Sequence, residues 1–237
     1  MSKILVLADS GFGKSTSLGS IPALKIKGLD PSKTFIISCT DKGLPFPGWK
    51  NNYPKFKSDG TGNFLETNDP VLMVKTIDYL LKNRPELENF VIDDINYAMQ
   101  DYYMDNAKQK GYTTFQNIGY DMGQLFKKFS LIHKMDKNII VLGHPEGYEE
   151  NNVVKYKLKT VGNMVDQYIT PEGKFNIVLM GKEEYSERTG EVTKYFVTGY
   201  DGNVRGKAPY GMFEKVYIPN DMGYVLDKAK EYEELNK

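Results

Sequence analysis

The octet Ala8–Ser15, with the letters ADSGFGKS, constrains the fold more than any other part of the chain. It follows the apolar run Ile4–Leu7, which is typical of a buried parallel strand. We expect a helix from near Lys14 to a point before Pro22. The octet fits the Walker A pattern except that Ala8 replaces the first glycine. A strand, a glycine-containing loop and a helix in this order predict a loop that wraps around phosphate groups.

Each part of the octet has a physical task. Glycines let backbone amides turn toward phosphate oxygens, and the amides at the N-terminus of the following helix attract negative charge. Lys14 reaches the β- and γ-phosphates, and the Ser15 hydroxyl completes a Mg²⁺ shell. Ala8 costs little in an ordinary backbone conformation, because only positions with positive φ demand glycine. The predicted nucleotide-binding residues are Ala8, Asp9, Ser10, Gly11, Phe12, Gly13, Lys14, Ser15 and Thr16.

Strand and helix patterns alternate through the first 147 residues. Thr34–Cys39, Phe90–Asp93 and Asn138–Gly143 are apolar runs that predict further buried strands. Amphipathic segments between them predict helices, one of which has Asp69 as its N-cap. This alternation predicts a parallel sheet.

The remaining segments follow other patterns. Residues 42–66 predict a long excursion with a short hairpin, and a loop is expected around residues 111–114. Alternating runs on both sides of Thr189-Gly190 predict a hairpin, and Asp221–Leu235 predicts a closing helix. The predicted fold class is therefore α/β, with a mostly parallel central sheet and a C-terminal antiparallel meander.

Length and charge set limits on organisation and partners. The 237 residues, 40% of them hydrophobic, are enough for the core of one large domain over residues 1–237. We expect core motifs in 1–147, a possible DNA loop and the meander in 148–220, and a C-terminal helix in 221–237. Lys plus Arg equal Asp plus Glu at 31 each, which argues against coating of duplex DNA by bulk charge but allows a local basic stripe.

Cysteine usage and hydropathy indicate a compartment. The single cysteine, Cys39, excludes an internal disulfide and fits a reducing environment. No apolar run approaches the ~20 residues that cross a bilayer, and the start lacks the long apolar stretch of a signal peptide. We expect a cytoplasmic protein without a membrane partner.

Carboxylates and a histidine follow the predicted strands. Asp93 stands where a Walker B acid belongs and is the expected Mg²⁺ ligand together with Ser15. Asp94 either holds a ligand of the Mg²⁺ ion in place or orients the attacking water as the base. The alternative is that Asp94 caps the next helix. Asp41 is a second candidate base if its strand lies beside the phosphate-loop strand, and otherwise a turn residue. His144 ends the fourth strand, where a polar side chain could sense loss of the γ-phosphate.

A basic stripe follows His144. In Val154–Lys159 the residues alternate, so Lys155, Lys157 and Lys159 share one face if the segment is extended. Such a face could bind the phosphates of single-stranded DNA while a nearby tyrosine stacks on a base. The alternative is that these lysines guard an exposed edge strand against pairing.

Together these motifs resemble the RecA-type branch of P-loop ATPases, and most closely short phage ATPases with only the RecA core, including single-strand-annealing recombinases. The resemblance implies a RecA-like core, ATP and Mg²⁺ as cofactors, and hydrolysis coupled to oligomer formation on single-stranded DNA, in the host cytoplasm if phage-encoded. The matching segments occur in the family's order: ADSGFGKST (8–16), ISCTDKG (37–43), FVIDDI (90–95), VLGHPEG (141–147) and VRGKAPYG (204–211).

The resemblance also implies roles for single residues. Asp41 matches the catalytic carboxylate after the second strand, although the family usually has Glu there, and His144 matches the polar residue after the fourth strand. Lys207 or Arg205 matches a basic residue that acts across a subunit interface on the neighbour's γ-phosphate. The alternative for these two is a pair of solvated residues in a loop.

Three functions remain open on the sequence. The first is an ATP-dependent DNA recombination or annealing factor that acts as an oligomer. The second is a nucleotide-gated module that binds a protein partner without touching DNA. The third, a nucleotide kinase, is less favoured because such enzymes clamp phosphates with several arginines, and this chain has only Arg84, Arg188 and Arg205.

Overall fold

Eight strands form one sheet in the computed structural model, which describes residues 1–106, 112–150, 153–160 and 170–235. Its order is β10-β9-β8-β1-β5-β4-β2-β3. The strands are β1 (Lys3–Leu7), β2 (Thr34–Ser38), β3 (Phe64–Glu66), β4 (Asn89–Asp93), β5 (Asn138–Gly143), β8 (Ile177–Ser186), β9 (Glu191–Val197) and β10 (Tyr217–Pro219). A separate two-stranded hairpin joins β6 (Pro145–Glu150) to β7 (Val153–Leu158).

The predicted fold class is confirmed. Strands β8, β1, β5, β4, β2 and β3 pair in parallel, whereas β8, β9 and β10 pair antiparallel at the C-terminal edge. Strand β5 lies between β1 and β4. Strand β1 leads into the octet Ala8–Ser15, called the phosphate loop below, and β4 ends in Asp93. The arrangement is the α/β type that the sequence patterns indicate, with a mostly parallel sheet and an antiparallel C-terminal edge.

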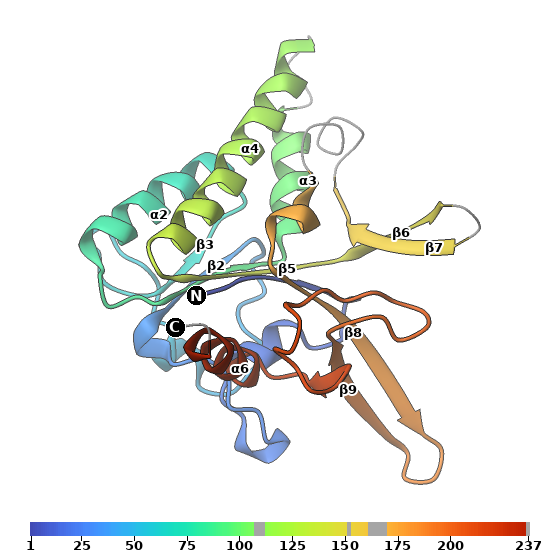
Figure 1. Ribbon diagram of the computed structural model, residues 1–237. Helices are drawn as coiled ribbons and strands as arrows, with labels where there is room; N and C mark the ends of the chain where they lie inside the picture. The colour runs from blue at the N-terminus through green and yellow to red at the C-terminus, as the bar shows by residue number, and fades with distance from the viewer. Residues whose placement is uncertain (107–111, 151–152, 161–169, 236–237) are drawn as a thin grey trace.

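Helices cover both faces of the sheet (Figure 1). Helices α2, α3 and α4 lie on one face, and α6 lies on the other together with the segment that follows β1. The helices are α1 (Trp49–Asn52), α2 (Pro70–Asn83), α3 (Ile95–Asn106), α4 (Tyr112–Lys134) and α6 (Met222–Glu234). The 3₁₀ turns are η1 (Ser15–Leu18), η2 (Pro22–Leu24), η3 (Pro31–Lys33) and η4 (Pro171–Lys174).

The continuous apolar runs of the strands follow from this double cover. Alternate residues of one strand enter different cores: Leu5 and Leu7 pack beneath α2, α3 and α4, while Ile4 and Val6 pack on the α6 side. All four side chains are fully buried, so both faces of the strand favour apolar residues. The strands were predicted correctly because they were recognised by continuous runs of apolar residues and not by an alternation of apolar and polar residues.

Three local predictions were wrong. The helix after the octet is only the four-residue turn η1, because the chain is already extended at Gly19 (φ −88°, ψ 149°). Residues 42–66 contain no hairpin, since β3 joins the sheet parallel to β2. Helix α4 already begins at Tyr112, where a loop was expected, and residue 111 lies outside the described residues.

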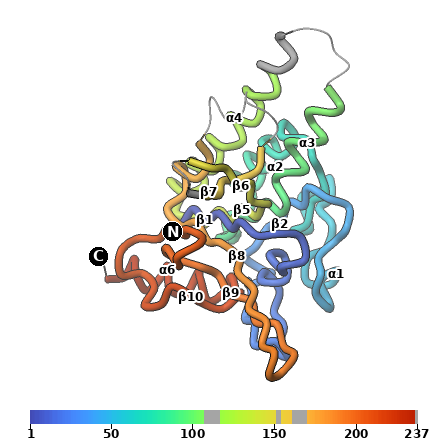
Figure 2. Tube along the Cα trace, turned by 90° about the vertical axis from the view of Figure 1, so that its right-hand side faces the viewer, coloured from blue at the N-terminus to red at the C-terminus, as the bar shows by residue number. Residues whose placement is uncertain are grey.

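The other predictions of elements hold. The Asp69 side chain accepts a hydrogen bond from Val71 N (2.8 Å) and caps α2, and Asp221 caps α6 through Gly223 N (2.9 Å). The hairpin at Thr189-Gly190 joins β8 to β9 and extends away from the sheet in two perpendicular views (Figures 1 and 2). Within the described residues, no helix combines the length and the apolarity needed to cross a membrane.

Candidate nucleotide-binding site

The octet forms a loop at the carboxyl end of β1, beside the ends of β5 and β4. Leu7 is in register with Gly143 of β5, and Ala8 N donates to the Gly143 carbonyl (3.2 Å). Ser15 Oγ donates a hydrogen bond of 2.9 Å to Oδ1 of Asp93, which lies 78 residues further along the chain. The sheet thus brings the predicted phosphate loop and the predicted metal-binding acid into direct contact.

The loop backbone has the conformation that the octet requires. Gly11 and Gly13 adopt left-handed conformations with φ of 85° and 99°, which side chains with a Cβ rarely tolerate. Ala8 is not among the non-glycine residues with positive φ, so its replacement of glycine costs no strain. Left-handed glycines are the torsions with which phosphate-binding loops turn backbone amides toward an anion.

Lys14 lies folded over the loop. Its Nζ donates to the carbonyls of Ala8 (2.9 Å) and Asp9 (3.1 Å), and only 6% of the residue is exposed. Burial lowers the pKa of Lys14, and the carboxylates of Asp94 and Asp93 oppose that change. The loop carbonyls therefore hold the ammonium where bound phosphates would otherwise be its partners.

Asp93 is almost fully buried, with 4% exposed. Burial, followed by repulsion from Asp94, raises the pKa of Asp93 to about 7, while the Ser15 hydrogen bond and the Lys14 charge act against the rise. A carboxylate and a hydroxyl in contact are oxygen ligands that suit Mg²⁺, which takes its other ligands from water and phosphates. In the described parts of the chain, no group of three or more His, Cys, Asp or Glu side chains is placed to hold a metal ion.

Asp94 combines backbone strain with a charged neighbour. Its φ is 60°, a left-handed value that costs a non-glycine residue roughly 1–3 kcal/mol in general. Its Oδ1 lies 3.5 Å from Nε2 of His144. Burial alone would raise the pKa of Asp94, but His144, Lys14 and Lys42 together lower it. The structure thus brings Asp94 and His144 together beside the phosphate loop.

His144 lies between Asp94 and the β6–β7 hairpin. It is joined to the hairpin through Asn96, a residue that the sequence analysis missed. The His144 amide donates to Oδ1 of Asn96 (2.6 Å), and Nδ2 of Asn96 donates to the carbonyl of Lys159. Asn96 therefore ties both ends of the hairpin to the start of α3. The available signal was a polar residue in the first turn of the expected helix, two residues after Asp94; Asn96 is 5% exposed in the structure.

Asp41 stands apart from the phosphate loop strand. Strands β5 and β4 separate β2 from β1, so the adjacency on which the Asp41 prediction depended is absent. Asp41 is exposed and lines a hollow with Tyr97 and Asp101, and the neighbouring Lys42 Nζ lies 5.2 Å from the Tyr97 ring centre. Its role as the base stays a prediction that the resemblance alone supports.

The basic stripe is extended, as predicted, but it is matched by acidic side chains. Lys155 pairs with Glu150, and Lys157 Nζ lies 3.7 Å from Oε2 of Glu146 on the opposite strand. Lys159 is exposed just beyond the end of β7. Both the DNA-binding role and the edge-guard role of these lysines stay open.

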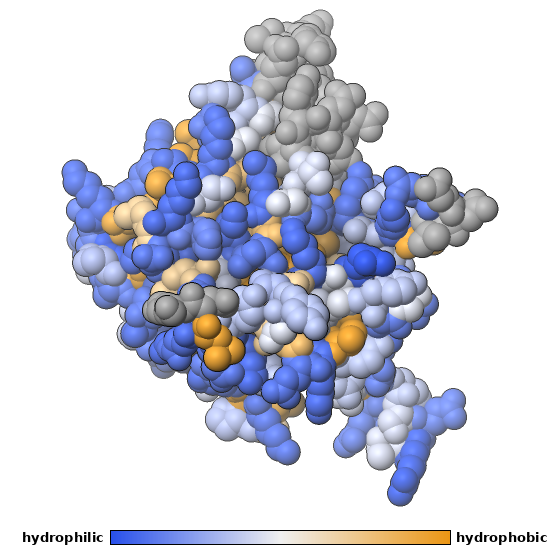
Figure 3. Space-filling view, viewed as in Figure 1, coloured by the Kyte–Doolittle hydropathy of each residue, from blue (hydrophilic) through white to orange (hydrophobic). Residues whose placement is uncertain are grey.

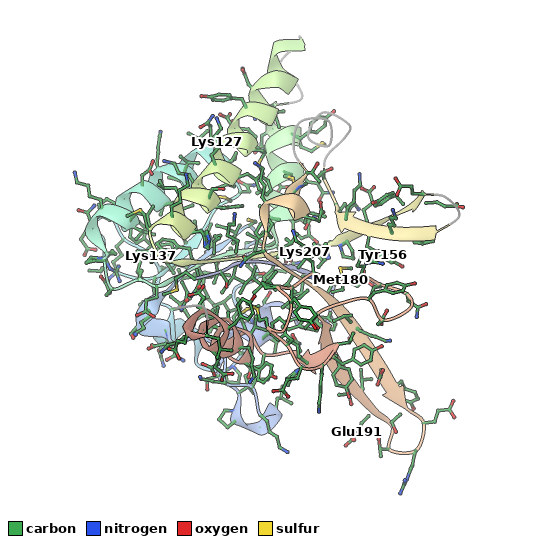
Figure 4. The ribbon with its side chains drawn as sticks, in the orientation of Figure 1. Lys127, Lys137, Tyr156, Met180, Glu191 and Lys207 are labelled. Atoms are coloured by element: carbon green, nitrogen blue, oxygen red, sulfur yellow. The ribbon has the colours of Figure 1, made fainter. Side chains whose placement is uncertain are left out.

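Lys207 is held within its own subunit. Its Nζ donates to the carbonyls of Phe175 (2.8 Å) and Glu172 (3.3 Å), and its backbone bridges to Val178 of β8. The Arg205 guanidinium lies 4.8 Å from the Tyr200 ring centre. Lys207 lines a cleft with Met180 and with Tyr156 of the β6–β7 hairpin (Figure 4). A role across a subunit interface stays a prediction.

Residues of β8, of β9 and of the segment after β10 contact the phosphate loop. A Cβ on Gly181 of β8 would come within 2.4 Å of the Ala8 Cβ and 3.0 Å of the Phe12 ring. The Phe12 ring packs on Phe196 of β9, with ring centres 6.0 Å apart. Asn220 Nδ2 donates to the Gly13 carbonyl (3.2 Å). Gly181 thus leaves the space that the methyl group of Ala8 fills.

Comparisons with known proteins give fold-level likenesses only. No family model and no curated protein matches the chain. The chain is similar to the flagellar accessory protein FlaH of Methanocaldococcus jannaschii, at 14% identity and a TM-score of 0.43, over 83% of this chain and 76% of that one. It is also similar to a KaiC-like protein of Pyrococcus horikoshii, at 12% identity and a TM-score of 0.43, over 83% and 77%. The assignments that follow rest on the geometry of the site itself.

The packing of Ala8 on Gly181 gives a test by paired substitution. Gly181→Ala should lower the melting temperature and weaken ADP binding, because overpacking costs about 1–3 kcal/mol and here displaces the loop. Adding Ala8→Gly should restore most of both quantities, since it removes the opposing methyl group. Gly199→Ala is the matched control, because a Cβ there meets nothing within 4 Å. Calorimetry and ADP titration would measure both effects, and wild-type behaviour of Gly181→Ala alone would contradict the packing argument.

Proposed function

We propose that the chain is a magnesium-dependent ATPase that binds the triphosphate in the loop Ala8–Ser15. The observation that carries the proposal is the 2.9 Å hydrogen bond from Ser15 Oγ to Asp93 Oδ1. It joins the two proposed oxygen ligands of Mg²⁺, one from the segment after β1 and one from the end of β4, with β5 between these strands. The left-handed glycines and the buried Lys14 beside it support the same reading.

The chemistry follows from where the charges lie. Phosphate oxygens would replace the carbonyls of Ala8 and Asp9 as partners of Lys14. Ser15 and Asp93 would hold Mg²⁺, which would supply positive charge to offset the charge on the phosphates. Asp94, with His144 at 3.5 Å, is the base that orients the attacking water in this proposal, and Asp41 is the alternative base. The choice of adenine over guanine follows from the family resemblance.

Loss of the γ-phosphate would be transmitted to the β6–β7 hairpin through contacts of Asp94, His144 and Asn96. His144 lies between Asp94 and the first hairpin strand, and Asn96 ties His144 and Lys159 to the helix that begins after Asp94. A shift of Asp94 or His144 on loss of the γ-phosphate would therefore move the base of the hairpin. We propose that this hairpin contacts the partner of the ATPase.

Single-stranded DNA is the partner that we propose for the hairpin, in recombination or annealing. Tyr148 and Tyr156 are 40% and 41% exposed and could stack on bases. Lys155 and Lys157 would exchange Glu150 and Glu146 for phosphates. We further propose self-association, in which Lys207 would leave its own carbonyls to reach a neighbouring site.

A nucleotide-gated module with a protein partner is the second candidate. The observation that favours it is the balance of charge on the hairpin, where the lysines already have glutamate partners. A kinase has less support, because Arg84 pairs with Glu86 and Arg205 stacks on Tyr200 rather than on the phosphate loop.

ATP hydrolysis by the purified protein tests the main proposal. Lys14→Ala should lower turnover about 100-fold or more, because it removes a cation from the developing negative charge. Asp93→Asn should lower turnover and raise the Mg²⁺ concentration that half-maximal turnover requires, because it removes the charged ligand. Lys82→Ala, an exposed lysine on α2, is the control and should match the wild type. Unchanged turnover in Lys14→Ala would refute the proposed site.

Binding of single-stranded oligonucleotides at several salt concentrations tests the partner. Replacing Lys155, Lys157 and Lys159 together by Ala should weaken binding and flatten its salt dependence. The matched variant Glu146→Gln with Glu150→Gln should strengthen binding, because it releases two lysines from ion pairs. If neither variant changes DNA affinity, or if DNA does not bind, the protein-partner alternative is favoured.

A further inference from the structure

The β8–β9 hairpin lies against the phosphate loop through two successive cross-strand pairs. Gly181 pairs with Phe196, and Glu183 pairs with Lys194. Residues two apart on a strand share a face, so both pairs face the loop side of the hairpin. The first pair packs under Ala8 and Phe12, as described above. The second pair lies one step further out, toward the end of the hairpin that carries Glu191 (Figure 4).

Lys194 reaches the rim of the phosphate loop. Its Nζ donates to the Gly11 carbonyl (2.8 Å), lies 3.1 Å from Oε1 of Glu183 and is 5.8 Å from the centre of the Phe12 ring. The side chain is 34% exposed, so it can change partners without unpacking the core. The surface around this hairpin is largely hydrophilic (Figure 3).

The position of this ammonium suits a bound triphosphate. Gly11 is one of the two left-handed glycines of the loop, and Lys14 lies on the carbonyls of Ala8 and Asp9. Lys194 therefore brings a second positive charge to the loop from a different part of the chain. Glu183 balances that charge when no phosphate is present. A triphosphate would compete with one carboxylate and one carbonyl for a flexible side chain, and the several negative charges of the triphosphate favour the exchange.

We propose that Lys194 is a catalytic residue that contacts the terminal phosphate of the nucleotide bound to its own subunit. This inference rests on the proposed ATPase function. In hydrolysis, water attacks the γ-phosphorus and gives a proton to the proposed base Asp94, while the bond to the β,γ-bridging oxygen breaks. Negative charge spread over the oxygens of the terminal phosphate then shifts onto the leaving ADP. Lys194 stabilises that charge, whereas Lys207 is held by the carbonyls of Phe175 and Glu172.

A purely structural role for Lys194 makes a different prediction. A side chain that only braces the Gly11 carbonyl would hold the loop equally for ADP and for ATP. Its loss would therefore weaken both nucleotides alike. A contact to the terminal phosphate is absent in the ADP complex, so its loss affects ATP affinity and turnover and spares ADP affinity.

The experiment measures kcat, ATP affinity and ADP affinity for Lys194→Ala and Lys194→Arg. Lys194→Ala should lower kcat about 100-fold, the scale for one preorganised donor, and leave ADP affinity within about twofold. Lys194→Arg should recover part of the lost turnover, because it retains the charge. Arg188→Ala is the matched control, since it removes a cation from the turn of the same hairpin and should leave every value unchanged.

Each result decides the inference. Equal weakening of ADP and ATP with unchanged kcat would assign Lys194 a bracing role and overturn the proposal, as would wild-type values in all three measurements. A melting temperature equal to the wild type shows that Lys194→Ala is folded. If the wild-type protein neither binds nor hydrolyses ATP, the proposed function fails and the inference fails with it. Wild-type turnover with an unaffected Lys194→Ala overturns only the inference.

Discussion

The hydrogen bond between Ser15 and Asp93 is the contact on which the rest of the site depends. It requires the carboxyl ends of β1 and β4 to lie close to each other on either side of β5, and the observed strand order places them there. It also requires a buried carboxylate, whose ionisation burial opposes. A bound cation would offset that penalty, which is why we propose Mg²⁺ at this contact.

Sequence patterns predicted the parts of the site that are local. The strand before the loop, the left-handed glycines and the acid at the end of β4 each follow from a few consecutive residues. Gly181, Lys194 and Asn96 were missed because their roles depend on contacts between distant segments. A glycine in a strand or a lysine in a hairpin carries no sign of what it will face. The predicted helix after the loop was too long because pattern alone does not show that the chain is extended from Gly19.

Two hairpins contact the site from different sides, and they differ in what they can do. The β6–β7 hairpin is attached through Asn96 and His144, which lie beside the acidic pair, so it can report the state of the nucleotide. The β8–β9 hairpin is attached through Gly181 and Lys194, which lie against the loop itself, so it can act on the phosphates. In our proposal, the β6–β7 hairpin senses the nucleotide and the β8–β9 hairpin stabilises its phosphates.

A crystal structure with Mg²⁺ and a non-hydrolysable ATP analogue tests the central claim most directly. We predict that the phosphates lie against the amides of residues 11–15 with Lys14 released from the Ala8 and Asp9 carbonyls. We also predict that the cation lies between Ser15 Oγ and the Asp93 carboxylate. A nucleotide bound elsewhere on the chain, or a loop whose Ser15–Asp93 contact excludes the cation in the presence of saturating ligand, would contradict the account.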